Sequence, residues 1–102
     1  MEATDRLRNA VGLCMRAGKC ASGDFAVEKK IAAGRVRLVI LDASASDNLV
    51  KKYTDAAAYH GFRLLRMDGL GAAIGKPDRK VMAVSDENFI KLIDGALAPK
   101  ES

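Results

Sequence analysis

The sequence predicts an α/β fold in which helices cover both faces of a sheet. Segments with the apolar spacing of helices alternate with short apolar runs, which is the pattern of strands connected by helices. The clearest run is Leu38 to Leu41, four consecutive apolar residues, as in a strand of a parallel sheet that is buried on both faces. A length of 102 residues suits one core, and we expect a single domain over residues 1–102.

Two helices are expected before the buried strand. The first presents one apolar face and ends at Gly18, the face being made of Leu7, Val11, Cys14 and Met15. The second runs from about Asp24 to Ala33, and Gly34 stops it. Asp24 is the expected N-cap, because its side chain accepts hydrogen bonds from the free N–H groups of a helix start. Residues 20–22 are a candidate for a fourth strand.

The remaining elements follow in regular order. Strands are expected at 36–41, 62–67 and 80–84, and a capping-rich loop at 42–48 leads into a third helix that ends at Gly61. A turn at 68–71 precedes a short helical piece at 70–74. Ser85 or Asp86 caps a last helix, and Pro99 ends the ordered chain. Because crossovers between parallel strands are right-handed, we expect the loops after the strands along one edge of the sheet.

Positive charge is concentrated in one part of the chain. The net charge is +4, from 17 basic and 13 acidic residues. Residues 16–37 carry a local charge of +4, from Arg16, Lys19, Lys29, Lys30, Arg35 and Arg37 against Asp24 and Glu28. Residues 66–80 carry a local +2, from Arg66, Lys76, Arg79 and Lys80 against Asp68 and Asp78. Such clusters are typical of polyanion binders, but a solvated helix face gives the same pattern.

The glycine-marked start of the second helix is the expected anion-binding site within this basic segment. The first N–H groups of a helix have no partner inside it, so they attract anions such as phosphate. Phe25 lies in the first turn and has two interpretations. The favoured one is a side chain folded back onto the core, and the other is a stacking surface for an unpaired base.

The patterns of other functions are missing from the sequence. No nucleophile–histidine pair or carboxylate pair stands out, and Cys14 and Cys20 have neither zinc nor redox spacing. The glycine-rich segment 69–75 departs from the dinucleotide fingerprint, whose third position is here Ile74. Gly71 allows close approach of backbone to neighbouring protein or to a ligand. We expect no enzyme activity, no cofactor, no metal and no small-molecule substrate.

The chain has no pattern of a membrane or secreted protein. No apolar run approaches the roughly 20 residues that span a bilayer, and residues 1–6 show no signal-peptide pattern. We expect a cytoplasmic protein without a membrane partner, in which both cysteines are reduced and Cys14 faces the core.

The order and spacing of several motifs resemble the kink-turn-binding ribosomal protein family. The motifs are Gly-Leu-Cys-Met-Arg-Ala-Gly-Lys19, Ser-Gly23, a helix closed by Gly34, Val-Arg-Leu-Val-Ile-Leu-Asp-Ala-Ser-Ala-Ser and Leu-Gly-Ala-Ala-Ile-Gly-Lys76. The family comprises the archaeal seven-Ae and eukaryotic thirty-e large-subunit proteins and their bacterial relatives, and the likeness is greatest to the bacterial YlxQ-like branch. The resemblance implies a three-layer α/β/α sandwich with a mostly four-stranded mixed sheet, and RNA as the anion.

The resemblance also implies where RNA would bind. By position, Gly23 allows close approach of backbone, Lys19 and Lys29 hold phosphates, and the loop 70–75 covers the bulged bases of a kink. The candidate RNA-binding residues are Arg16, Lys19, Ser22, Gly23, Asp24, Phe25, Lys29, Lys30, Leu70, Gly71, Ala72 and Ile74.

The sequence departs from the family's pattern at one point. Typical members carry Asn-Glu where Phe25 and Ala26 stand, and neither of these side chains hydrogen-bonds to base edges. The sequence therefore predicts a non-enzymatic protein, ribosomal or translation-associated, that binds structured RNA with relaxed kink-turn specificity. The alternative is a protein–protein interaction module on the same fold, in which Phe25 and Ala26 belong to an apolar contact.

Overall fold

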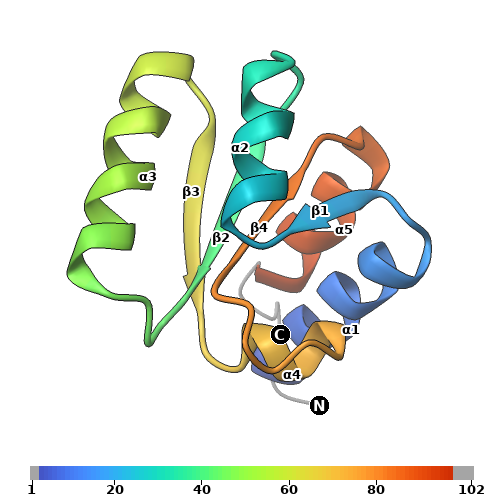
Figure 1. Cartoon of the computed structure of the whole chain (residues 1–102). Helices are drawn as coiled ribbons and strands as arrows, with labels where there is room; N and C mark the ends of the chain where they lie inside the picture. The colour runs from blue at the N-terminus through green and yellow to red at the C-terminus, as the bar shows by residue number, and fades with distance from the viewer. Residues whose placement is uncertain (1–2, 98–102) are drawn as a thin grey trace.

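The computed structural model describes residues 3–97, and Figure 1 shows the arrangement of its elements. Pro99 lies outside the described residues. In chain order the elements are α1 (Ala3–Arg16), β1 (Cys20–Ser22), α2 (Asp24–Ala32), β2 (Leu38–Asp42), α3 (Asp47–His60), β3 (Arg63–Met67), α4 (Leu70–Ile74), β4 (Val81–Val84) and α5 (Glu87–Leu97).

The four strands form one mixed sheet in the order β1-β4-β2-β3. β2 and β3 are parallel, whereas β4 runs antiparallel to both of its neighbours. The four apolar residues of β2 are fully buried because helices cover both faces of this central strand. The predicted fold class is confirmed, and the segment 20–22 is the fourth strand.

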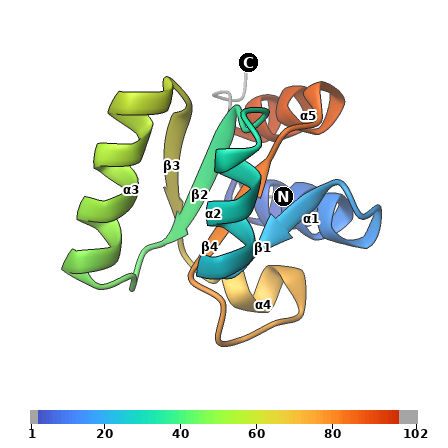
Figure 2. The same ribbon diagram turned by 45° about the horizontal axis from the view of Figure 1, so that its top comes forward.

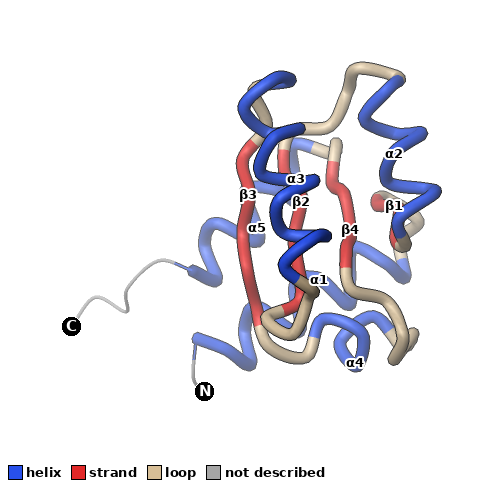
Figure 3. The backbone as a smooth tube through the Cα atoms, turned by 60° about the vertical axis from the view of Figure 1, so that its left-hand side comes forward, coloured by secondary structure: helices blue, strands red, loops and turns tan. Residues whose placement is uncertain are grey.

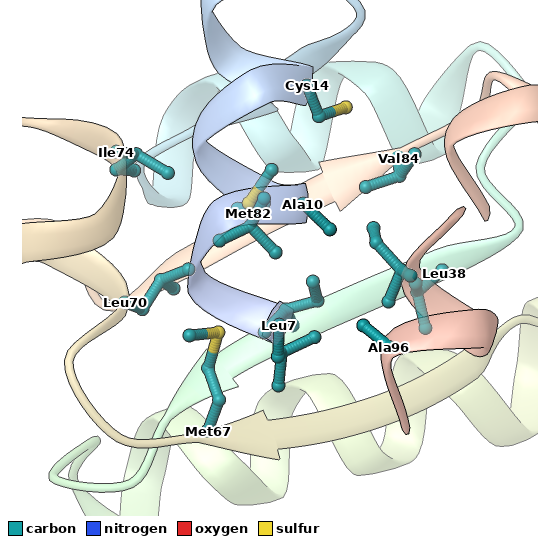
Figure 4. Close-up of a cluster of buried hydrophobic side chains, with 13 residues drawn as sticks. Leu7, Ala10, Cys14, Leu38, Met67, Leu70, Ile74, Met82, Val84 and Ala96 are labelled. Atoms are coloured by element: carbon teal, nitrogen blue, oxygen red, sulfur yellow. The ribbon is translucent and has the colours of Figure 1, made fainter. Parts of the chain in front are cut away.

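Two helical layers enclose the sheet and give the molecule two cores (Figures 2 and 3). α2 and α3 cover one face, where Val27 and Tyr53 pack against Val39 and Leu41. α1, α4 and α5 cover the other face, whose buried cluster includes Cys14, as predicted (Figure 4). The arrangement is therefore an α/β/α sandwich.

Several predicted boundaries differ from the structure. The strands predicted to begin at Val36 and Phe62 begin at Leu38 and Arg63, where the paired register of the sheet starts; Val36 and Phe62 still pack on the α2–α3 core. β2 extends to Asp42, which pairs with Met67 across the sheet. The predicted strand ended at Leu41, so the polar residue Asp42 is an additional strand residue that the apolar pattern did not predict.

Capping side chains also differ from expectation in one place. Asp86 caps α5, since its Oδ1 accepts a hydrogen bond from the Phe89 N–H at 3.0 Å. Asp24 was expected to cap α2, but it is the first residue of that helix and Gly23 occupies the N-cap. The Asp24 carboxylate is instead bonded to α3, as described below.

The strand register brings four segments to one end of the sheet. Ser22 pairs with Met82, Leu41 with Val81, and the last residue of β2 with the last of β3. The ends of β1, β2 and β3 therefore lie beside the start of β4, and both α2 and α4 begin there. The expectation that the loops after the strands share one edge holds for β1, β2 and β3 but is wrong for β4, which runs antiparallel and ends at the opposite edge.

Candidate functional site

The start of α2 is an uncapped helix N-terminus. The N-cap, Gly23, has φ 90° and ψ 150°, a conformation that essentially only glycine adopts. No side chain caps the helix, so its first N–H groups are open to a ligand. Such a start carries partial positive charge and favours an anion.

Arg79 lies directly over this helix start. Its Nη1 donates a hydrogen bond to the Ser22 carbonyl at 2.9 Å, and a Cβ built on Gly23 would lie 2.1 Å from the same nitrogen. Arg79 and Lys80 line a hollow of about 330 Å³ together with Gly23 and Asp24. A fixed guanidinium thus stands beside the free N–H groups of α2, and we call this arrangement the Gly23 site.

The acidic residues of α2 are paired with α3. The Asp24 carboxylate accepts hydrogen bonds from Lys52 Nζ at 2.8 Å and from the Tyr53 hydroxyl at 2.5 Å. The lysine first, and then the tyrosine, hold the pKa of Asp24 below its usual value, whereas burial and then the aspartate raise the pKa of Tyr53. Lys52 also pairs with Glu28. These contacts hold the carboxylates on the α3 side of the helix.

Phe25 projects into solvent from the first turn of α2. Its residue exposure is 75%, so the interpretation that it folds onto the core is wrong. Val27 and Ile31 already occupy the face of α2 that meets the sheet, and Phe25 lies on a different face of the helix. Lys29, one turn later, places its Nζ 5.5 Å from the centre of the ring. The pair offers a flat surface and a cation together.

Asp42 organises the neighbouring segments at this end of the sheet. Its Oδ1 accepts a hydrogen bond from the Leu70 N–H at 2.9 Å, and its Oδ2 accepts from the Ser44 N–H at 2.9 Å. Lys80 donates to the Ser44 hydroxyl at 2.8 Å. Burial by itself raises the pKa of Asp42, but the bonds from Ser44 and Leu70 outweigh it and lower that pKa. The position of α4 thus depends on this carboxylate.

Most of the predicted second contact loop is part of the core. The side chains of Leu70 and Ile74 are buried, so the expectation that they pack against bases or sugars is wrong. A Cβ on Gly71 would lie 2.7 Å from the carbonyl oxygens of both Lys76 and Pro77. Gly71 therefore serves close packing within the protein, and Ala72 alone among the four predicted residues of this loop is exposed.

The structure separates the predicted basic residues. Lys29 accompanies Phe25, and Arg16 is exposed at the end of α1, with its guanidinium near Gly12 where α1 packs on α4. Lys19 and Lys30 instead line a groove at the opposite end of the sheet. Ser22 contributes its carbonyl oxygen to the Arg79 contact.

Arg79 and Lys80 were missing from the predicted site. The signal available in the sequence was the local charge of +2 over residues 66–80. That signal gave no reason to place these residues beside Gly23, because their proximity depends on the antiparallel pairing of β1 with β4.

Two further observations concern residues 3–97. In this part of the chain no three His, Cys, Asp or Glu side chains gather in a way that could hold a metal ion. Among the same residues no helix is long and apolar enough to cross a membrane.

Fold and site together define the chain as a small α/β/α domain with a basic, uncapped helix start. The "RNA-binding protein YlxQ" of Bacillus subtilis (strain 168) is 40% identical, over 82% of this chain and 91% of that protein. The protein of the same name from Enterococcus faecium is 35% identical, over 85% and 90%. The chain belongs to the YlxQ family. No protein-family model matches it.

Solved structures share this fold. A protein of unknown function from Bacillus halodurans C superposes with a TM-score of 0.82 at 29% identity, covering 90% of this chain and 96% of that one. The Giardia lamblia 15.5kD RNA binding protein superposes with a TM-score of 0.75 at 19% identity, over 93% and 84%. At that identity the second likeness concerns the fold alone.

Proposed function

We propose that this chain is a non-enzymatic, cytoplasmic RNA-binding domain that acts on structured RNA, ribosomal or translation-associated, with relaxed selectivity for kinked RNA. The observation that carries the proposal is the Gly23 site, in which Arg79 lies beside the uncapped N–H groups of α2, while Phe25 in the first turn of the same helix is exposed. The names of the two YlxQ relatives support RNA as the partner.

In the proposed mechanism, both backbone N–H groups and side chains bind the RNA. The first N–H groups of α2 hold one phosphate beside the guanidinium of Arg79, which fills the space left by the missing side chain of Gly23. Arg79 and Lys80 neutralise neighbouring phosphates, and Lys29 does so beside the ring of Phe25. The ring stacks on an unpaired base, which requires no hydrogen bond and so tolerates any base.

This chemistry explains the expected relaxed selectivity. Side chains that donate to or accept from base edges read sequence, whereas phosphate contacts fix position only. Phe25 and Ala26 have neither donors nor acceptors in their side chains. Selectivity would then come from the shape of an RNA that exposes one unstacked base beside a bent backbone.

A salt series on the purified protein tests the proposal. If about three to four phosphates are neutralised, the logarithm of affinity falls with the logarithm of salt concentration at a slope of about −3. Filter binding would compare a kinked RNA, a plain RNA duplex and a buffer blank. Failure to find saturable binding at low salt, or affinity indifferent to salt, would refute the proposal.

The alternative, a protein-interaction module, is favoured by a separate surface. Leu13 and Leu92 are partly exposed and line an apolar groove of about 420 Å³ between α1 and α5. Affinity purification with and without nuclease separates the two functions. Association with ribosomes that nuclease abolishes supports RNA binding, and nuclease-resistant association with a protein supports the module.

A further inference from the structure

A basic groove lies at the end of the sheet opposite the Gly23 site. Cys20 and Leu38 both pair with Val84, so the starts of β1 and β2 lie beside the end of β4. The segments that flank these strands enclose a groove of about 640 Å³. Its charged and polar lining residues are Lys19, Lys30, Arg35, Arg37, Ser85 and Asp86, and we call it the Lys30 groove.

The cations of this groove are largely free of acidic partners. Within residues 3–97, Lys19, Lys30 and Arg35 form no ion pair, and Arg37 forms an exposed one with Glu87 at 3.4 Å. The Asp86 carboxylate accepts the capping hydrogen bond of α5. Four cations thus converge on a concave surface that contains one carboxylate, which is already hydrogen-bonded.

One residue of the groove wall has an unsatisfied hydroxyl. The Ser85 hydroxyl oxygen is buried and has no hydrogen-bond partner within the described part of the chain, and Ser85 is one of the residues that line the groove. Buried polar atoms are nearly always hydrogen-bonded, so this hydroxyl stands out among the lining residues.

The arrangement of the cations favours a chain of phosphates over one small anion. They come from three separate segments, the α1–β1 turn, α2 and the segment that leads into β2, so each segment can offer a cation to a different phosphate. None of the lining residues is aromatic, and the groove therefore has no surface on which a base could stack. These features suit a sugar–phosphate backbone.

We propose that the Lys30 groove binds the phosphate backbone of a second segment of the RNA whose unpaired base lies at Phe25. This inference rests on the proposed function for the identity of the polyanion. The two surfaces lie near opposite ends of α2, which spans nine residues, a length of about 13 Å at 1.5 Å per residue. An RNA that leaves the Gly23 site along α2 reaches the groove within a few nucleotides.

Amide chemical shifts measured by NMR test both surfaces separately. The ¹⁵N-labelled chain is titrated with a kinked RNA that carries a helix on each side of the kink, and separately with inorganic phosphate. We expect saturable shifts with the RNA at Lys30, Arg35 and Ser85. In Lys30→Glu these shifts should vanish and the salt slope of RNA affinity should fall by about 1. Lys91→Glu on α5 makes the same charge change and should alter neither.

Each outcome decides the inference. RNA-induced shifts both in the groove and around Gly23 support it. Shifts in the groove without any around Gly23 overturn it, because the groove then binds RNA independently of Phe25, and the proposed site at Gly23 fails as well. RNA-induced shifts around Gly23 alone overturn the inference and leave the proposed function intact. A groove that responds to inorganic phosphate but not to RNA binds only small anions, and this too overturns it, as does a groove that responds to neither probe.

Discussion

The guanidinium of Arg79 donates a hydrogen bond to the carbonyl oxygen of Ser22 and occupies the space that a side chain at position 23 would need. This contact ties the segment before β4 to the turn before α2. Position 23 therefore requires glycine for two reasons: the residue adopts φ 90°, and a side chain would clash with Arg79. The conformation of the helix start and the position of its nearest cation are therefore coupled.

Gly23→Ala is expected to lower both stability and RNA affinity. The backbone conformation at Gly23 costs a residue with a side chain about 1 to 3 kcal/mol, and the new methyl group displaces Arg79. Chemical denaturation measures the first effect and filter binding the second. Gly61→Ala is the control, because Gly61 also has a positive φ, 83°, but nothing lies within 4 Å of its added Cβ. Equal RNA affinity in both variants would contradict the role given to Arg79.

Phe25→Ala is expected to weaken RNA binding without destabilising the fold. Stacking of a base on an aromatic ring contributes about 1 to 3 kcal/mol, and the ring is too exposed to contribute much to the core. Tyr59→Ala, which removes a ring with a residue exposure of 86% from α3, serves as the control. Affinity and thermal unfolding are measured for both. A loss of affinity no larger than that of the tyrosine variant would argue against base stacking.

The double variant Phe25→Asn, Ala26→Glu is expected to improve discrimination between kinked RNA and plain duplex. The two substitutions supply donors and acceptors in the first turn of α2, at the positions where the family resemblance implies Asn-Glu. The ratio of the two affinities is the measurement, and Phe25→Ser, Ala26→Ser provides polar side chains without that pairing. An unchanged ratio would mean that the start of α2 does not lie against base pairs.

Asp42→Asn is expected to reduce stability at neutral pH and to make stability less sensitive to acid. Loss of hydrogen bonds to a buried charged group costs about 1 to 3 kcal/mol. Because the pKa of Asp42 is lowered in the fold, its contribution is complete above the unfolded value of about 3.9. The contribution is lost as pH falls through the lower folded pKa.

Urea unfolding at several pH values between 7 and 2 tests this prediction. The difference in unfolding free energy between wild type and Asp42→Asn should shrink toward acid pH, since protonation of Asp42 makes the two side chains alike in charge. Asp55→Asn is a suitable control, because that carboxylate pairs with Lys51 on the exposed surface of α3. A difference that stays constant with pH would contradict the role of the Asp42 charge.

Local pattern alone was enough to predict the elements of this fold. The continuous apolar run Leu38 to Leu41 indicates a strand that is buried on both faces of a sheet. The glycines at 18, 34 and 61 mark helix ends, because glycine readily adopts a positive φ. Clustered charge in residues 16–37 predicted a polyanion surface, and Gly23 with Phe25 marked the start of α2 as its centre. These patterns involve residues that are close together in the sequence, so they can be recognised without knowledge of the tertiary structure.

Tertiary structure decided which residues share a surface. Strand pairing places Arg79 over Gly23, although 56 positions separate them in the chain, and places Lys19 and Lys30 at the far end of the sheet. Burial decided that Leu70 and Ile74 belong to the core while Phe25 faces solvent, because the sheet meets only one face of each helix. The sequence by itself determined that positive charge surrounds an exposed helix start. Only long-range packing determined which cations lie there, since that depends on the register of β1 against β4.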